Sequence, residues 1–520
     1  MYGAPKGIRT PVTGVRGQRP RPLDDGSVGS WRAGRQSGGI IRAVRESSNR
    51  IIWHPVTCLR NHPGEIKINV PVIIPRAQHI VTRSQISENA LKVLYRLKEA
   101  GYASLLVGGC VRDLMLGREP KDFDVVTDAR PEQIRKLFHN ARVIGRRFRL
   151  VHVRFGWEII EVATFRAIPR DITEEPLPTE ETEEGEAEAE EDAPAETEAP
   201  DHNVFGSQEE DAVRRDFTVN ALYYDIRDFS VIDYVGGVAD LEAGILRVIG
   251  DPETRFREDP VRMLRAVRFA AKLGFKLEDK TAAPIRELAP LMASVPPARM
   301  FEEVLKLFHG GYALETWELL RHYGLFQHLF PLTEKSLEHE EGGFPVTLVP
   351  RALANTDARV NEDKPVTPAF LFAAMLWEPV REQMGEYIVR GMNGHDAMFR
   401  AAEHVLREQL RHVTIPKRFS VPMREIWDMQ GRFERRSGQQ AFRLVENKRF
   451  RAAYDFLLLR AETGEADPAL AEWWTRFQSV DENERRIMVA EFSAPSPGSG
   501  KRRRRRRKRR PASAAAPGNE

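Results

Sequence analysis

The chain contains few cysteines and no long apolar run. Its 520 residues include two cysteines, Cys58 and Cys110, which cannot form the disulfide framework of a small secreted domain and which favour a reducing cytoplasm. Cys110 follows two glycines and is expected to be a small buried residue rather than a nucleophile. No apolar stretch approaches the roughly 20 residues of a membrane span, and the first residues lack the apolar segment of a secretory signal. These absences favour a cytoplasmic protein without a membrane span.

Charge of each sign is concentrated in blocks, although the formal net charge is only +3. Glutamate dominates residues 173–201, whereas residues 501–510 read KRRRRRRKRR. Blocks of one sign are usually solvated and unfolded. The acidic block is predicted to be a surface loop within a domain, since long loops cost little additional closure entropy. The basic block is predicted to attract a polyanion such as a nucleic acid; the simpler alternative is a tail that only aids solubility.

Apolar patterning changes along the chain. Short apolar runs and alternating segments in the first half indicate strands between helices, whereas apolar positions three and four residues apart in the second half indicate helices almost throughout. The expected fold is an α/β head with a mixed sheet and helices, followed by an all-α neck and body, with disordered termini. The predicted segments are 1–70, disordered or added by a start placed too far upstream; 71–250, the head, with the acidic loop 173–201; 251–310, the neck; 311–492, the body; and 493–520, a disordered Arg-rich tail.

A pair of glycines follows a predicted strand in the sequence LLVGGCVRD (105–113). At Gly108 and Gly109 the backbone can approach a phosphate closely, with its N–H groups and the N-terminus of the following helix directed at it. Arg112, one turn into that helix, is placed to reach the same phosphates. A lone glycine pair is more often an ordinary turn, so the phosphate-binding interpretation depends on what accompanies it.

Two aspartates accompany the glycines in the sequence KDFDVV (121–126). Asp122 and Asp124 stand two positions apart at the start of a predicted strand, so both carboxylates project from one face. Such a pair can hold two Mg²⁺ ions, one to activate a hydroxyl group and one to neutralise a leaving pyrophosphate. Glu161, on a strand of a predicted hairpin, is a further candidate ligand, but it could equally face solvent or pair with an arginine. A glycine turn and an aspartate pair only a short helix apart favour a catalytic site over two unrelated turns.

GGxVRD followed by DxD resembles the nucleotidyltransferase superfamily, in particular its bacterial branch of poly(A) polymerases and tRNA CCA-adding enzymes. RRDFTVNAL (214–222) is similar to the RRD motif of that family, and EDPVRMLRAVRFAAKLGF (258–275) is similar to its neck-helix motif. The resemblance implies an α/β nucleotidyltransferase head in which Asp122, Asp124 and Asp216 are catalytic and Arg215 contacts the nucleotide. It also implies that the neck helix selects the incoming base.

Within the neck motif, Asp259 and Arg262 are three positions apart and are expected on one helix face. A carboxylate beside a guanidinium offers an acceptor and fixed donors, which can recognise the Watson–Crick edge of a base without a template. Arg265 and Arg268 continue this face and are predicted to contact phosphates. The alternative is an amphipathic helix that carries surface ion pairs.

A further motif favours polyadenylation over CCA addition. VIGRRFRLVHV (143–153) resembles a signature typical of the bacterial poly(A) polymerases, and the resemblance covers residues 71–474 approximately. It implies ATP and RNA 3′ ends as substrates, Mg²⁺ as cofactor and RNA-decay proteins as candidate partners of a monomeric chain. The alternatives are a tRNA CCA-adding enzyme, which would also incorporate CTP, and an RNA-binding protein with a silent transferase site. Arginines in and beside this signature could line a phosphate channel: Arg146, Arg147, Arg149 and Arg154.

Overall fold

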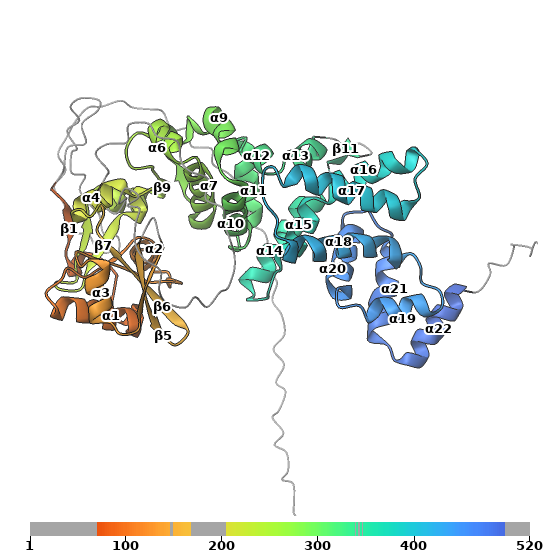
Figure 1. Ribbon diagram of the computed structural model, residues 1–520, viewed down its shortest axis with the longest axis horizontal. Helices are drawn as coiled ribbons and strands as arrows, with labels where there is room; N and C mark the ends of the chain where they lie inside the picture. Colours follow the sequence, from red (N-terminus) through yellow and green to blue (C-terminus); the bar gives the residue numbers. More distant parts are fainter. Residues whose placement is uncertain are drawn as a thin grey trace, which may run out of the picture. The chain divides into compact units, whose positions relative to one another are not determined.

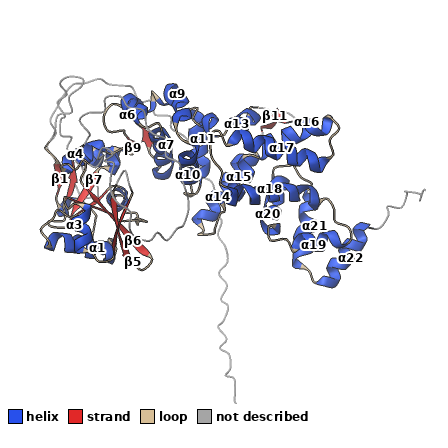
Figure 2. Ribbon diagram, in the orientation of Figure 1, coloured by secondary structure: helices blue, strands red, loops and turns tan. Residues whose placement is uncertain are grey.

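An α/β domain precedes a region built almost entirely of helices in the computed structural model (Figures 1 and 2). This order confirms the expected mixed-sheet head followed by an all-α neck and body. The N-terminal segment, the acidic block and the basic tail lie outside the described residues, so their expected disorder stays a prediction, as do the segment boundaries. The structure describes residues 70–145, 149–167, 204–338 and 347–493, with the backbone of 340–341 and 344–345.

The head is organised around an eight-stranded sheet with the order β1-β8-β7-β2-β3-β6-β5-β4. β3 and β6 pair in parallel, and every other neighbouring pair is antiparallel. The central strands β2 and β7 are buried throughout, because helices and loops cover both faces there, whereas β4 at one edge alternates between exposed and half-buried residues. The strands are β1 (Val72–Ile74), β2 (Leu105–Val107), β3 (Asp124–Thr127), β4 (Ala141–Ile144), β5 (Leu150–Phe155), β6 (Glu158–Thr164), β7 (Leu222–Asp225) and β8 (Val231–Asp233).

Helix α1 (Glu88–Glu99) begins where the sequence predicts it. The Ser87 hydroxyl accepts a hydrogen bond from the Ala90 amide at 3.2 Å and so satisfies one of the free N–H groups of the first turn. The buried residues of α1 recur at helical spacing and pack against β3 and β6. The other head helices are α2 (Gly109–Met115), α3 (Pro131–Leu137), α4 (Gln208–Arg214), the 3₁₀ turn η3 (Thr218–Asn220) and α5 (Gly237–Ala243).

The chain on either side of the undescribed residues 168–203 is closed by backbone pairing. The Ala167 amide donates to the Val204 carbonyl at 2.9 Å, and the Gly206 amide donates to the Phe165 carbonyl at 3.0 Å. A Cβ atom on Gly206 would lie 2.6 Å from the Ala167 nitrogen, so the close approach of these two segments requires glycine at that position. The acidic block is therefore inserted between two chain segments that are already hydrogen-bonded to each other.

The neck is built on α6 (Pro252–Glu258) and α7 (Val261–Leu273), which pack together and whose second helix also contacts α10 and α11. The remaining elements, which follow α5 in the chain, are β9 (Ile245–Leu246), β10 (Lys276–Leu277), α8 (Asp279–Ala282), α9 (Ile285–Leu288), η4 (Ala289–Ser294), α10 (Pro297–Phe308), α11 (Ala313–His322), α12 (Phe326–Leu329), α13 (Pro331–Leu337), β11 (Glu340–Glu341), β12 (Phe344–Pro345), α14 (Leu348–Asn361), α15 (Pro368–Met375), α16 (Trp377–Val389), α17 (Gly394–Gln409), α18 (Lys417–Phe433), α19 (Gln439–Val445), α20 (Phe450–Glu462), α21 (Pro468–Ser479) and α22 (Glu482–Ser493).

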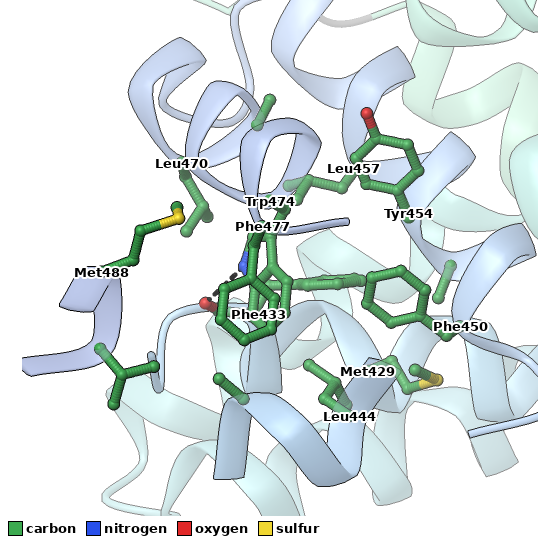
Figure 3. Packing of buried hydrophobic residues seen from close by; sticks show 14 residues of the cluster. Met429, Phe433, Leu444, Phe450, Tyr454, Leu457, Leu470, Trp474, Phe477 and Met488 are labelled. Atoms are coloured by element: carbon green, nitrogen blue, oxygen red, sulfur yellow. Dashed lines mark hydrogen bonds between the residues drawn. The ribbon is translucent and has the colours of Figure 1, made fainter. Parts of the chain in front are cut away.

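Aromatic side chains hold the last helices together (Figure 3). Trp474 is fully buried, and its ring lies edge-on to Phe433 with centroids 5.2 Å apart. The Trp474 indole N–H donates to the Phe433 carbonyl at 3.0 Å, so the polar atom of this large residue is satisfied inside the core. Among the described helices, none is long and apolar enough to cross a membrane.

Candidate active site

The glycine turn lies where β2 passes into α2. Gly108 has φ +79°, a backbone conformation that residues with a Cβ atom rarely adopt. A Cβ atom at Gly108 would also lie 3.4 Å from the Arg215 Nη1 atom, so the turn and the RRD segment are in van der Waals proximity. The Gly108 amide itself donates to the Leu222 carbonyl at 3.1 Å. The absence of a side chain thus leaves room beside an arginine, as a phosphate site would require.

Asp124 lies next to Glu161 because β3 and β6 run in parallel with these two residues as Cα partners. Asp122 is exposed and precedes the strand, whereas Asp124 is its first residue and is half-buried. Burial first, then the charge of Glu161, and to a smaller extent that of Asp122, raise the pKa of Asp124 to about 6, against the opposing effect of Arg215. The structure therefore brings together three carboxylates that the sequence names as candidate ligands.

This set of donors fits a hard divalent cation. Among the described residues, no three metal-ligating side chains converge closely enough to form a complete protein cage. Mg²⁺ is usually held by only one or two carboxylates, with waters and substrate phosphates completing its coordination. Because the acidic neighbours of Asp124 raise its pKa, a cation here would offset their mutual repulsion.

Glu161 also has a partner that the sequence does not predict. The His152 Nε2 atom lies 3.3 Å from a Glu161 carboxylate oxygen, and the Glu161 side chain is half exposed. The expected alternatives were solvent or an arginine; the structure gives solvent together with a histidine from the neighbouring strand β5.

Arg215 is fixed by the residues around it. Its Nε and Nη2 atoms donate to the Asp211 carboxylate at 3.1 and 3.0 Å, and its guanidinium lies 5.6 Å from the centre of the Tyr223 ring. The Tyr223 hydroxyl also donates to Asp211, at 2.9 Å. Arg215 is therefore held beside both Gly108 and Asp124, where one guanidinium can face a nucleotide phosphate.

Arg112 is placed differently from the expectation that it reaches the phosphates directly. Its side chain is only 2% exposed; its Nε atom donates to Asp113 at 2.8 Å and its Nη1 atom to Asn220 at 2.5 Å. Asn220 in turn donates to Asp216 at 3.3 Å, and Arg265 donates to Asp216 at 3.0 Å. A chain of polar contacts thus runs from α2 through η3 to the neck helix α7.

Asp216 is ionised within this network. Burial alone would raise its pKa, but the ion pair with Arg265 and hydrogen bonds from Asn220 and the Phe217 amide outweigh burial and hold the pKa below its usual range. Arg265 therefore pairs with a carboxylate of the head, whereas the sequence predicts a phosphate contact for it. Asp216 joins the head to α7 through this pair.

Three guanidinium groups surround the ring of Phe269 on α7. The Cζ atoms of Arg112, Arg265 and Arg268 lie 5.4, 5.4 and 4.4 Å from its centre. Arg112 and Arg265 are paired with carboxylates, whereas within the described part of the chain Arg268 has no ion-pair partner and its buried Nε atom has no acceptor. An anion can therefore find a donor at Arg268 without breaking an existing pair.

Lys272 is a site residue that the sequence reasoning missed. Its Nζ atom lies 3.9 Å from Asp113. Burial first lowers the pKa of Lys272, Asp113 opposes this, and the like charges of Arg112, Arg268 and Lys121 lower it further. This excess of positive charge around Lys272 would favour the binding of a triphosphate there. Lys272 lies one helical turn after Arg268, and this spacing is the feature of the sequence that indicates its place beside the site.

Asp259 and Arg262 do not share one helix face, so that expectation is wrong. Asp259 has the extended angles φ −147° and ψ 97°, and it separates α6 from α7. The cause is Pro260, because the residue before a proline is disfavoured in the helical region. Asp259 pairs with Arg299 of α10 at 2.8 Å, and Arg262 pairs with Glu258 at 2.7 Å.

Cys110 is buried, as expected. Burial first and the nearby Asp124 charge raise the pKa of its thiol to about 12. The thiol therefore stays protonated at neutral pH and does not act as a nucleophile.

A mixed sheet that presents clustered carboxylates beside a glycine turn, followed by a helical neck with basic residues, defines a template-independent nucleotidyltransferase. Family models agree: residues 104–247 match the poly A polymerase head domain, residues 274–337 match the probable RNA and SrmB-binding site of polymerase A, and residues 390–510 match the polymerase A arginine-rich C-terminus. The chain is 50% identical to poly(A) polymerase I of Escherichia coli O157:H7, over 82% of this chain and 90% of the relative. It is 44% identical to that of Haemophilus influenzae, over 81% and 90%. The chain belongs to the bacterial poly(A) polymerase family.

CCA-adding enzymes are more distant relatives. The one from Lactobacillus helveticus is 37% identical over 44% of this chain and 52% of its own length. A tRNA-processing enzyme solved in an apo form superposes with a TM-score of 0.51 at 22% identity, over 78% of this chain and 98% of that one. This likeness concerns the fold alone.

Proposed function

We propose that the chain transfers adenylate from ATP to RNA 3′ ends without a template, releasing pyrophosphate. One observation carries the assignment of the site. Asp124 lies beside Glu161 and within electrostatic range of Asp122 and Arg215, and Arg215 borders the side-chain-free turn at Gly108. A site for cations and a site for phosphates are therefore adjacent, as the reaction requires.

Asp122 and Asp124 would hold Mg²⁺, with Glu161 close enough to assist. When bound, the cation would favour ionisation of the RNA 3′ hydroxyl and offset negative charge on the triphosphate. Arg215 is positioned to donate to phosphate oxygens from the head, and Arg268 from the neck. Arg112 and Asp216 act differently. Arg112 is buried, Asp216 is partly buried, and both are hydrogen-bonded to Asn220, so they position the groups that touch the nucleotide.

Base selection is assigned to Asp259 and Arg262. Adenine presents an amino donor and a ring acceptor on its Watson–Crick edge, which a carboxylate and a guanidinium can satisfy. Since the two side chains pair with Arg299 and Glu258 in the free protein, base binding must replace or share those pairs. Selectivity for ATP would then depend on Arg299 and Glu258 as well.

The assignment is tested by extension of a generic RNA and of a tRNA that lacks its CCA end, with each nucleoside triphosphate separately and Mg²⁺ present. Long ladders on the generic RNA with ATP alone are expected. Extension of the tRNA alone, with CTP required, would transfer the assignment to CCA addition. No extension of either RNA would indicate an RNA-binding protein with a silent site.

The wider role that we propose is polyadenylation in RNA turnover, carried out in the cytoplasm by a monomer that RNA-decay proteins recruit. Family membership and the absence of a membrane-spanning helix among the described residues support this role. Light scattering of the purified protein would test the monomer, and a dimer at micromolar concentration would contradict it.

A further inference from the structure

The catalytic carboxylates lie at one end of an open face of the sheet. Arg142, His152, Glu161 and Asp124 are successive Cα partners across β4, β5, β6 and β3. Residues directly opposite one another on neighbouring strands project from the same face. The row therefore extends from Asp124 to the edge of the sheet, about 14 Å away, since adjacent strands are about 4.8 Å apart.

A second row lies nearer the turn of the β5–β6 hairpin. Arg154 and Ile159 are Cα partners, both are exposed, and the intervening residues Val153 and Ile160 are buried on the opposite face. Trp157 lies in the turn beyond them, and its side chain is 103% exposed, the full value for a free residue. We call Arg142, Arg154, Ile159 and Trp157 the hairpin face.

The turn that presents Trp157 is firmly anchored. The neighbouring Glu158 carboxylate accepts hydrogen bonds from the Ser87 hydroxyl and the Asn89 amide, both at 2.5 Å, at the start of α1. Gly156 has φ +62° and supplies the reversal of the chain. Trp157 is therefore displayed by a fixed backbone, and exposing an aromatic side chain of this size forgoes burial that would stabilise the fold.

The hairpin face carries positive charge that can contact a ligand. Neither the Arg142 nor the Arg154 guanidinium has an ion-pair partner within the described residues, in contrast to the paired Arg215 and Arg265 of the site. Two guanidinium groups without ion-pair partners there, on the strands of the hairpin whose turn carries an exposed indole, suit a flexible polyanion that carries aromatic rings, which is single-stranded nucleic acid.

We propose that the hairpin face binds the last nucleotides of the RNA that is being extended, a proposal that rests on the proposed function. A base stacks on Trp157 against Ile159, and phosphates contact Arg154 and Arg142. Trp157 immediately precedes β6 and is four residues from Glu161, which is at most about 13 Å along the chain. This distance corresponds to roughly four stacked nucleotides, so the stacked base lies upstream of the reacting 3′ hydroxyl.

The test compares Trp157→Ala and Trp157→Phe with the intact chain in extension of oligoadenylate primers. Trp157→Ala is expected to raise the KM for a primer longer than this span about 5- to 150-fold, the contribution of one base–aromatic stack. The KM for ATP and the kcat should stay unchanged. A dinucleotide primer is too short to reach Trp157, so the intact chain and Trp157→Ala should extend it equally. Trp157→Phe keeps most of the affinity because it keeps a ring.

Ile73→Ala provides the matched control, because Ile73 is 58% exposed on β1 at the other edge of the same sheet. Its primer KM should stay at the intact value. Arg154→Ala should reduce the salt dependence of primer binding by about one phosphate contact.

Several results would overturn the proposal: an unchanged primer KM in Trp157→Ala, an equal loss with the dinucleotide primer, or an equal loss in Ile73→Ala. A failure of the intact chain to extend any RNA with ATP is a different result, because it removes the proposed function itself and this proposal with it. Thermal midpoints of the variants identify any loss that comes from unfolding.

Discussion

Asp124 shows how single residues define the chemistry of the site. Partial burial and the neighbours Glu161 and Asp122 raise its pKa, so its ionised form depends on nearby positive charge. Asp124→Asn keeps the size of the side chain but removes the charge. We expect kcat to fall at least about 1,000-fold, since cation-assisted stabilisation of the transition state amounts to several kcal/mol. Single-turnover extension at saturating ATP measures this loss.

RNA affinity should be almost unaffected in Asp124→Asn, because other surfaces bind the RNA. Asp279→Asn is a suitable control, since the Asp279 side chain is 89% exposed and pairs with Lys276. A rate near that of the intact chain in Asp124→Asn would contradict the assignment of this carboxylate as a ligand.

Glu378 is a second residue whose ionisation has a consequence, here for stability. It is fully buried on α16; burial first and a hydrogen bond with the Glu465 carboxyl raise its pKa to about 8, although Arg381 opposes this. In the unfolded chain the group ionises at its ordinary, lower pKa. The folded state therefore binds the extra proton between the two values, and stability falls as pH rises through this window.

Glu378→Gln cannot ionise and should be more stable than the intact chain at high pH. The difference in the free energy of unfolding is expected to reach at most about 5 kcal/mol above about pH 8 and to disappear below about pH 4.5. Urea unfolding across that range measures it. Glu403→Gln, in an exposed pair with Arg407, should show no such pH dependence; parallel curves for Glu378→Gln and the intact chain would refute the raised pKa.

The site residues that the sequence alone identifies are those whose defining neighbours are close in the chain. Gly108 and the pair Asp122 and Asp124 could be recognised because a turn and a strand start are local features. The convergence of Arg112, Arg265 and Arg268 on Phe269 could not, because it depends on how α7 packs against the head. The burial of Arg112 depends on the same packing and is not evident from the sequence.

At the scale of elements, the contact between Asp216 and Arg265 fastens α7 to the head. Arg265→Met would leave the partly buried Asp216 carboxylate without its charged partner, with a loss of stability of about 1–3 kcal/mol. Adding Asp216→Asn should recover part of the lost stability, because the uncompensated charge is then removed. Urea unfolding of the two single variants and the double variant gives the coupling energy.

Arg268→Met on the same helix is the matched control, since it removes a guanidinium that has no ion-pair partner among the described residues. Its cost should be smaller than that of Arg265→Met. Additive losses in the double variant would mean that Asp216 and Arg265 do not stabilise each other.

Helices were predictable as elements, but the corner between two of them was not. The apolar spacing of the neck motif correctly indicates α7. The break between the helices at Asp259 arises from Pro260. The partner of the Asp259 side chain is Arg299 of α10, which is distant in the chain and donates to the Asp259 carboxylate. A local pattern can mark where a helix runs, whereas the partner of a residue at its end is set by tertiary packing.

At the scale of the whole molecule, the basic block 501–510 is expected to act as a general RNA tether. Its deletion should weaken RNA binding, more strongly at low salt, and leave ATP binding unchanged, because attraction to phosphates is independent of sequence and is screened by salt. Filter binding over a series of salt concentrations tests this. Equal affinities with and without the block at low salt would refute the tether.

The paired stems around residues 168–203 bear on how this polymerase can change over time. Hydrogen bonds between Ala167 and Val204, and between Phe165 and Gly206, join the two chain segments that flank these residues. Each doubling of the intervening length costs only about 0.6 kcal/mol in closure entropy. Lineages are therefore free to lengthen, shorten or recharge this stretch with little selection from folding, and a laboratory can use the same position to graft a reporter domain into the enzyme.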